Sequence, residues 1–187
     1  MTDEPAYCAD VAYQGAPGAF SEEAAWALAG PAARVLACRT LADVATALAS
    51  GRAASAVIPV WNSIAGEVPE ASAIASRACW RVVGWHTMPI VQCLVARPGA
   101  RMERIRDVRS HPVALAQCRQ FFAGHAWLTP RADFDTAGSA AWVARRRTRR
   151  QAAVASARAA RLWGLDVLEE GIQDTADNRT RFVHLMS

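Results

Sequence analysis

The sequence predicts an α/β fold built from two lobes, the second inserted into the first. Short apolar segments typical of strands alternate with Ala-rich segments typical of helices along the 187 residues. Strands that alternate with helices of this length indicate a parallel α/β sheet. An extended stretch over residues 81–96 is long enough to leave one sheet and enter another, and a new series of strand and helix patterns follows it.

The first lobe opens with three predicted strands and three predicted helices. The strands are expected at residues 11–14, 35–37 and 56–60, and the helices at residues 22–28, 41–50 and 68–78. Ser21 is a natural N-cap for the first helix, because Glu22 and Glu23 follow it and suit the positive end of the helix dipole. Thr40, with Asp43 three residues later, predicts a capping box at the second helix.

The second lobe repeats the alternation from Arg97 onward. We expect a helix near 102–108, a helix at 113–122, a strand at 131–135, a helix at 136–145, a strand at 151–155 and a helix at 156–162 that Gly164 ends. The sequence therefore predicts one domain, with lobe 1 at about 1–88 and 168–187 and lobe 2 at about 89–167. The cleft between the lobes is the expected ligand site, because ligands of open α/β sheets bind outside the carboxyl ends of the strands.

Composition and charge exclude several classes of protein. Hydrophobic residues make up 52% of the chain, which suits a globular core. No apolar run approaches the roughly 18 residues of a membrane span. The acidic N-terminus, Met1–Pro5, lacks the pattern of a secretory signal, so we expect a cytoplasmic protein. The net charge is +4, and all 21 basic residues are Arg. This balance would attract an anionic substrate but is too diffuse to indicate nucleic acid.

The cysteines and histidines predict neither a disulfide framework nor a metal site. Five cysteines are widely spaced, and no Cys-x-x-Cys or His-x-x-x-His pattern occurs. An odd number of cysteines without a secretory signal argues against disulfides, and each is interpreted as a small buried hydrophobic residue. We expect no metal.

Three loops between a strand and a helix carry groups that suit an anion. The turn Gly15–Ser21 is either a tight connection or an anion seat built from backbone amides. Thr136 either caps the helix that it opens or donates a hydrogen bond to a carboxylate. His111 is either a donor to a ligand or an ordinary loop histidine.

The densest charge run, Arg145–Arg150, ends a predicted helix. A nucleic-acid site would need a basic face with stacking aromatic residues. The favoured interpretation is a solvated helix end.

Two strand ends bring together an amide, two hydroxyls and a guanidinium. Asn62 and Ser63 follow the apolar strand at 56–60, with Trp61 in the same predicted loop. Thr180 and Arg181 precede an apolar strand that begins at Phe182, and an extended backbone would point them to opposite sides. An arginine beside an apolar strand needs a partner or an anionic ligand.

Five blocks in this order resemble the catalytic domain of prephenate dehydratases. They are Ala12–Ala25, Ile58–Gly66, His111–Pro112 with Gln117–Cys118, Asp135–Ala140, and Asn178–Phe182. The resemblance implies a two-lobed fold like that of type II periplasmic binding proteins, with the substrate in the interlobe cleft. It also implies conversion of prephenate to phenylpyruvate, water and carbon dioxide in phenylalanine biosynthesis, without a metal or organic cofactor.

The resemblance assigns expected roles to residues of these blocks. Thr180 would donate a proton to the leaving hydroxyl, and Arg181 would hold a carboxylate by a bidentate contact. Asn62, Ser63 and Thr136 would position the substrate. Further expected substrate contacts are Phe182, Ala137, Asn178, Ala19, Phe20, Ser21 and Trp61.

Two departures from the family pattern affect these expectations. The family has Glu where this chain has Trp61, so a possible acid, base or hydrogen-bond anchor is replaced by an indole. The chain also ends soon after the Thr-Arg-Phe block, so we expect a stand-alone catalytic domain without an ACT regulatory domain.

Three functions stay open at this point. The first is a dehydratase acting on prephenate, and possibly on arogenate. The second is a prephenate decarboxylase that keeps the hydroxyl, although the intact Thr180–Phe182 block argues against it. The third is a non-catalytic protein that binds an aromatic-pathway acid, with Trp61 stacked on its ring. We expect a small-molecule ligand and a homo-oligomer, with no nucleic-acid or membrane partner.

Overall fold

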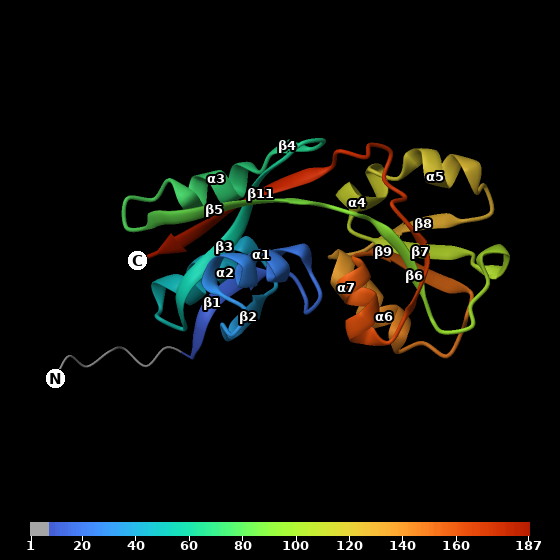
Figure 1. Ribbon diagram of the computed structural model, residues 1–187, viewed down its shortest axis with the longest axis horizontal. Coiled ribbons are helices and arrows are strands. Elements are labelled where there is room, and N and C mark those ends of the chain that lie inside the picture. The colour runs from blue at the N-terminus through green and yellow to red at the C-terminus, as the bar shows by residue number, and fades with distance from the viewer. Residues whose placement is uncertain (1–7) are drawn as a thin grey trace. The chain divides into compact units, whose positions relative to one another are not determined.

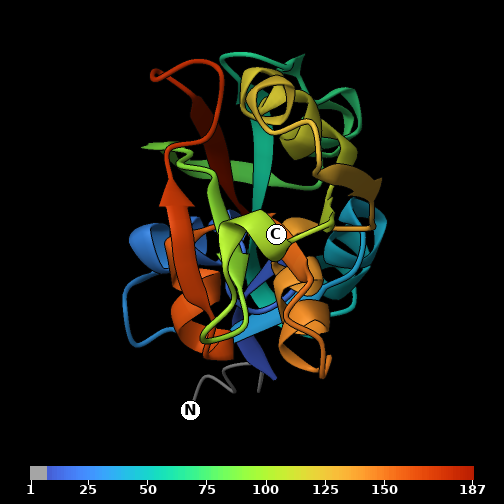
Figure 2. The ribbon, with the colours of Figure 1, turned by 90° about the vertical axis from the view of Figure 1, so that its right-hand side faces the viewer.

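The structure is a computed structural model that describes residues 8–187, and these residues form two compact units. The first unit contains residues 8–15, 21–88 and 179–187, and the second contains residues 16–20 and 89–178. The expected return to the first lobe at about residue 168 lies eleven residues before the observed boundary at Arg179. The reason is β10 (Asp166–Glu170), which pairs with β6 (Cys93–Ala96) and so stays in the second unit (Figure 2).

The first unit is built on a mixed sheet (Figure 1). The strand order is β2-β1-β3-β11-β5, with β4 paired to β3. The strands are β1 (Ala9–Gln14), β2 (Val35–Cys38), β3 (Ala53–Asn62), β4 (Gly66–Glu67), β5 (Arg81–Pro89) and β11 (Arg179–Met186). β1 runs parallel to β2 and β3, but β11 runs antiparallel to β3. The predicted parallel pairing holds for β1, β2 and β3, but the sheet is mixed because the returning strand β11 runs in the opposite direction.

The helices of the first unit are α1 (Phe20–Ala29), α2 (Leu41–Ala49) and α3 (Pro69–Ala75). The predicted capping box of α2 is confirmed, with Thr40 and Asp43 each accepting from the other's backbone N–H. Ser21 is not an N-cap, because α1 already begins at Phe20 and places Ser21 inside its first turn. Apolar side chains of α2 and α3 pack with those of the sheet in one core, which includes Leu41, Val44, Leu48, Ile58, Ile74 and Leu185.

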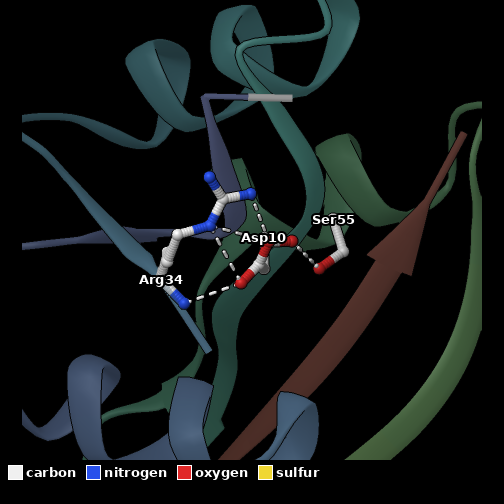
Figure 3. Close-up of polar contacts among 3 residues, drawn as sticks. All are labelled: Asp10, Arg34 and Ser55. Atoms are coloured by element: carbon white, nitrogen blue, oxygen red, sulfur yellow. Dashed lines mark hydrogen bonds and ion pairs between the residues drawn. The ribbon is translucent and has the colours of Figure 1, made fainter. Parts of the chain in front are cut away.

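An ion pair joins β1 to the residue before β2 (Figure 3). Asp10 accepts from the backbone N–H and the Nη2 of Arg34, both at 2.8 Å, and the Oγ of Ser55 in β3 donates to the carbonyl of Asp10 at 2.8 Å. The Arg34 hydrogen bond holds the pKa of the Asp10 carboxyl below its usual value. Asp10 thereby links three segments at the start of the sheet.

The second unit has its own mixed sheet, in the order β10-β6-β9-β7-β8 (Figure 1). The remaining strands are β7 (Asp107–Ser110), β8 (Thr129–Ala132) and β9 (Gln151–Ala155). β6 is antiparallel to β9 and β10, whereas β7 is parallel to β8 and β9. The predicted helix at 102–108 is wrong beyond Arg104, where a single 3-10 turn, η1 (Met102–Arg104), ends. The backbone then extends into β7, which pairs with strands that follow much later in the sequence.

The helices of the second unit are α4 (Pro112–Ala116), α5 (Arg119–Gly124), α6 (Thr136–Ala144) and α7 (Ala157–Trp163). The single helix predicted at 113–122 is two helices. The carboxylate of Asp174 accepts from the backbone N–H groups of Arg119 (3.1 Å) and Gln120 (2.8 Å), which caps a new helix start. The core of this unit includes Leu94, Ile105, Val108, Phe121 and Val154.

The glycine turn after β1 packs tightly within the second unit. Gly18 has a φ of +95°, and a Cβ placed on it would lie 2.8 Å from the Cα of Ala159 in α7. Its carbonyl accepts from the Oγ of Ser156 at 2.9 Å, and the Nε1 of Trp163 donates to the carbonyl of Pro17 at 3.2 Å. Glycine is required here both by the backbone conformation and by the close approach of α7.

Between residues 8 and 187, no helix is long and apolar enough to cross a membrane. The same residues contain no group of three or more His, Cys, Asp and Glu side chains that could hold a metal ion.

Candidate active site

The Asn62 side chain connects the end of β3 to the start of β11. Asn62 stands opposite Thr180 in the strand register. Its Nδ2 donates to the Oγ1 of Thr180 at 2.9 Å and to the carbonyl of Arg179 at 3.0 Å. Its Oδ1 accepts from the backbone N–H groups of Ile64 (3.0 Å) and Ala65 (2.9 Å). The two backbone donors on one side and the two acceptors on the other determine the orientation of the carboxamide.

Thr180 is placed as a hydrogen-bond donor by this contact. Its side chain is buried, with the residue 9% exposed, and its oxygen accepts from Asn62. A hydroxyl has one proton to donate, and accepting from an amide leaves that proton for another acceptor. Hydrogen bonds in a chain also polarise one another, so the Asn62 contact strengthens Thr180 as a donor.

Ser63 continues the pairing of β3 and β11 by one residue. Its backbone N–H donates to the carbonyl of Arg179 at 2.9 Å, and its Oγ accepts from the backbone N–H of Arg179 at 2.9 Å. Ser63 therefore helps to hold the start of β11, and its expected contact with the substrate stays a prediction.

Trp61 and Arg181 are cross-strand neighbours on the face opposite to Thr180. The guanidinium carbon of Arg181 lies 5.7 Å from the centre of the Trp61 ring, a cation–π geometry. Trp61 is 38% exposed and belongs to β3, not to a loop as predicted. On its other side it faces Glu67 of β4. The predicted opposite orientation of Thr180 and Arg181 is confirmed, since Thr180 is buried and Arg181 is exposed.

A bulge follows this pair. Arg181 stands opposite Trp61, but Phe182 stands opposite Pro59, so Val60 is the extra residue on β3. A bulge bends the strand and increases its twist next to the pair. Phe182 itself is 1% exposed, in the interior of the first unit. Ser21 is also buried there.

Asn178 belongs to a buried amide network in the second unit. Its Nδ2 donates to the Oε1 of Gln117 at 3.0 Å, and the same oxygen accepts from the Nε2 of Gln92 at 3.2 Å. Its carbonyl accepts from the backbone N–H of Ile90 at 2.7 Å. All three amide side chains are at most 5% exposed. This network holds the segments 89–92 and 174–178 together, a role that the sequence did not suggest for Gln92.

Thr136 and Ala137 form the first turn of α6. Asp135, not Thr136, caps this helix by accepting from the backbone N–H of Gly138. Thr136 is half-buried, and Ala137 is fully buried. Of the turn before α1, Ala19 is buried and Phe20 is half-buried.

His111 and Asp135, both in the second unit, have pKa values shifted in opposite directions. Burial raises the pKa of the Asp135 carboxyl, and burial lowers the pKa of the His111 imidazole. The Nδ1 of His111 accepts from the backbone N–H of Val113 at 3.2 Å and caps α4. This contact suits a neutral imidazole with its proton on Nε2.

The structure gathers five of the predicted residues into one group, in the first unit. Trp61, Asn62, Ser63, Thr180 and Arg181 lie together in the first unit. Thr136, Ala137 and Asn178 lie in the second unit, with Ala19 and Phe20. The group in the first unit offers a polarised hydroxyl and a guanidinium on the adjacent residues Thr180 and Arg181. Its two strand ends are far apart in sequence, with 118 positions between Asn62 and Thr180.

Comparison with known proteins identifies the class to which this fold and this site belong. The family model described as prephenate dehydratase matches residues 11–187. A crystal structure of prephenate dehydratase from Arthrobacter aurescens, in complex with L-Phe, superposes with a TM-score of 0.85 at 30% identity and covers 95% of this chain and 60% of that chain. The chain belongs to the prephenate dehydratase family, and the predicted two-part α/β fold is confirmed.

Two curated relatives show how similar this chain is to known dehydratases and how much of their length it covers. Arogenate dehydratase 3 of Arabidopsis thaliana, a chloroplastic protein, is 43% identical over 94% of this chain and 41% of the relative. A bifunctional N-acyl-homoserine lactone acylase/prephenate dehydratase of Komagataeibacter europaeus is 39% identical over 92% of this chain and 60% of the relative. The chain thus spans about two fifths of the plant protein and three fifths of the bacterial one.

Proposed function

We propose that this protein converts prephenate to phenylpyruvate, water and carbon dioxide in phenylalanine biosynthesis. The observation that carries the proposal is the 2.9 Å hydrogen bond from Asn62 to the hydroxyl oxygen of Thr180. It leaves the Thr180 proton to be donated, as departure of a hydroxide requires. Family membership supports the same reaction, since the match covers residues 11–187.

Two bonds break in the proposed reaction, and Thr180 acts at one of them. The carbon–oxygen bond of the ring hydroxyl breaks, and the leaving oxygen takes the Thr180 proton to become water. The bond from the ring to its carboxylate breaks in the same process, and its electron pair completes the aromatic ring as carbon dioxide leaves. Thr180 then recovers its proton from solvent, so no oxidant or cofactor is consumed.

Arg181 has a separate role in the proposal. It is exposed on the opposite face of β11 from Thr180, with its guanidinium over Trp61. We therefore assign it to a substrate carboxylate rather than to the leaving hydroxyl. A guanidinium matches a carboxylate with two parallel hydrogen bonds. The other predicted substrate contacts still depend on the family resemblance. They are Ser63, Thr136, Ala137, Asn178, Ala19, Phe20, Ser21 and Phe182.

The Thr180 assignment is tested by two substitutions. Thr180→Val keeps the shape of the side chain but can neither accept from Asn62 nor donate, so we expect kcat to fall by about 100-fold or more. Thr180→Ser keeps the hydroxyl and should retain most of the activity. Products from purified protein and prephenate would be identified by mass spectrometry. Full activity of the Val variant would remove Thr180 from the mechanism.

The same assay separates the other two functions. A decarboxylated product that keeps its hydroxyl would indicate the decarboxylase, and tight binding without turnover would indicate a binding protein. Arogenate, run in parallel, would establish the substrate preference. A cytoplasmic location and a homo-oligomeric state remain proposals, to be tested by cell fractionation and by light scattering of the purified protein.

A further inference from the structure

Six exposed arginines line one open pocket of about 630 Å³ in the second unit. The lining residues are Gly99, Arg101, Arg104, Arg106, Arg147, Arg149 and Arg150. We call this cavity the arginine pocket. More than a quarter of the 21 arginines of the chain therefore gather at one place, although the net charge of the whole chain is only +4.

The arginine run after α6 divides into two parts with different surroundings. The guanidinium of Arg146 lies 4.0 Å from the ring centre of Trp142, and that of Arg145 lies 5.7 Å from the ring centre of Trp163. Arg147, Arg149 and Arg150 instead line the pocket. All five arginines of the run are exposed, as the predicted solvated helix end requires.

Strand pairing brings the two halves of the pocket together. Asp107 and Gln151 are partners in the parallel pair β7–β9, so the segments that precede these strands lie side by side (Figure 1). The backbone N–H of Arg106 donates to the carbonyl of Arg150 at 2.8 Å. Arg149 donates from Nε to the carbonyl of Pro98 at 2.9 Å, which holds its side chain at the wall. The pocket is thus part of the fold rather than a chance meeting of loose side chains.

No carboxylate lines the arginine pocket. The ion pairs recorded among residues 8–187 involve Arg34, Arg109 and Arg131, none of which belongs to the lining. Asp166 accepts from the backbone N–H of Gly99, at the edge of the pocket, through a single 3.2 Å contact. Six like charges around one pocket repel one another, and a bound anion with several charges would relieve the repulsion.

We propose that the arginine pocket binds a small polyphosphate. Guanidinium groups match phosphate oxygens with paired hydrogen bonds, and six of them suit a chain of phosphates better than a single anion. The lining contains no aromatic residue on which a base could stack. Recognition of single-stranded nucleic acid commonly uses such stacking, so the pocket suits the phosphate chain itself. The bound phosphates would belong either to free inorganic polyphosphate or to the triphosphate of a nucleotide.

Calorimetry on the full chain tests the proposal, with sodium tripolyphosphate as the probe at constant ionic strength. The pocket variant is Arg101→Gln, Arg104→Gln and Arg147→Gln, because the structure records no hydrogen bond from these three side chains. The matched control is Arg52→Gln, Arg81→Gln and Arg161→Gln, which removes the same charge from exposed positions outside the pocket. We expect saturable binding that weakens about tenfold or more in the pocket variant and stays within about twofold in the control.

The following outcomes of the binding experiments would support or overturn polyphosphate binding at the arginine pocket. Equal weakening in both variants would show a general charge effect and overturn the proposal, as would the absence of saturable binding to the unmodified protein. Tighter binding of a single-stranded RNA, with a steep dependence on salt, would replace it with a nucleic-acid surface. ATP binding as tightly as tripolyphosphate would support recognition of the phosphate chain alone, and tighter ATP binding would identify a nucleotide as the ligand. Orthophosphate should bind more weakly than either.

Discussion

At the scale of single residues, the candidate site offers a neutral hydroxyl, that of Thr180, where proton donation to a leaving group usually employs a stronger acid. A threonine hydroxyl is a weak acid, so its neighbours must make it an effective donor. Asn62 does so by donating to the hydroxyl oxygen while two backbone N–H groups hold its own oxygen in place. The carboxamide cannot rotate without losing four hydrogen bonds, which preorganises the donor before substrate arrives.

The Trp61 position provides a test of how the site is tuned. Trp61→Glu places a carboxylate opposite Arg181 and replaces a cation–π contact with an ion pair. We expect dehydratase activity to rise severalfold, because hydrogen bonds orient a guanidinium more strictly than an aromatic face does. Trp61→Gln is the neutral control, and kcat/KM for prephenate is the measurement. A fall in both variants would mean that the indole is part of the substrate pocket.

The half-buried His184 leads us to expect that the protein becomes less stable to unfolding as the pH falls. Burial lowers the pKa of this histidine in β11, and its Nε2 has no hydrogen-bond partner among the described residues. The unfolded chain then binds a proton more readily than the folded one, so the free energy of unfolding falls as the pH drops below about 6.5.

His184→Phe should reduce this loss, as measured by urea unfolding between pH 8 and pH 5. The lowered pKa of His111 affects both proteins equally and cancels in the comparison. Parallel curves for the two proteins would show that His184 does not contribute to the pH dependence.

At the scale of elements, the sequence predicted those helices and strands whose ends are determined by residues close to them in the chain. The strand at 151–155 has the bounds that its apolar pattern predicts, and Thr40 and Gly164 occupy the cap positions expected of them. The break between α4 and α5 could not be predicted in the same way. Asp174, which caps α5, is 55 positions away from Arg119. Strand β7 was likewise hidden, because its partners lie far along the chain.

The same limit applies to the candidate site. The types of residue at the strand ends indicated Thr180, Arg181, Asn62 and Ser63 one by one. The hydrogen bond that joins Asn62 to Thr180 depends on the register of β3 and β11, which a bulge adjusts at Val60. No local pattern in the sequence contains that register.

The turn between β1 and α1 offers a test at this scale. Gly18→Ala meets two penalties, a positive φ and a clash with the backbone of α7. Gly30→Ala is the matched control, because Gly30 has a φ of +100° and no atom within 4 Å of an added Cβ. We expect about 1–2 kcal/mol of destabilisation for Gly30→Ala and about 1–3 kcal/mol more for Gly18→Ala. Equal losses, measured by urea unfolding, would show that α7 moves away at little cost.

At the scale of the whole molecule, the two units differ in how the chain builds them. The second unit is nearly continuous in sequence, whereas the first is assembled from segments on both sides of it. β11 is not an edge strand of the first unit, since it lies between β3 and β5. The first sheet therefore depends on residues that follow the entire second unit.

Removal of residues 179–187 tests this dependence. We expect hydrogen exchange to accelerate in β1, β3 and β5, because the deletion removes the strand that joins β3 to β5. Exchange in β6, β7 and β9 should stay slow, since their partner strands all lie within residues 93–170. Mass spectrometry of peptides from both proteins would measure the difference. Loss of protection in both units would show that they unfold as one.

The central place of β11 also sets an order of events at the ribosome. Translation completes the strands β6, β7, β8, β9 and β10 before it reaches Arg179. During that interval β3 and β5 have been made but lack the strand that separates them in the finished sheet. Until β11 is made, the apolar segment 56–60 of β3 has an unpaired edge on the side that β11 will occupy. Unpaired edges of this kind allow strands of different nascent chains to associate. We therefore expect the nascent protein to be exposed to aggregation through its first unit until β11 has been synthesised.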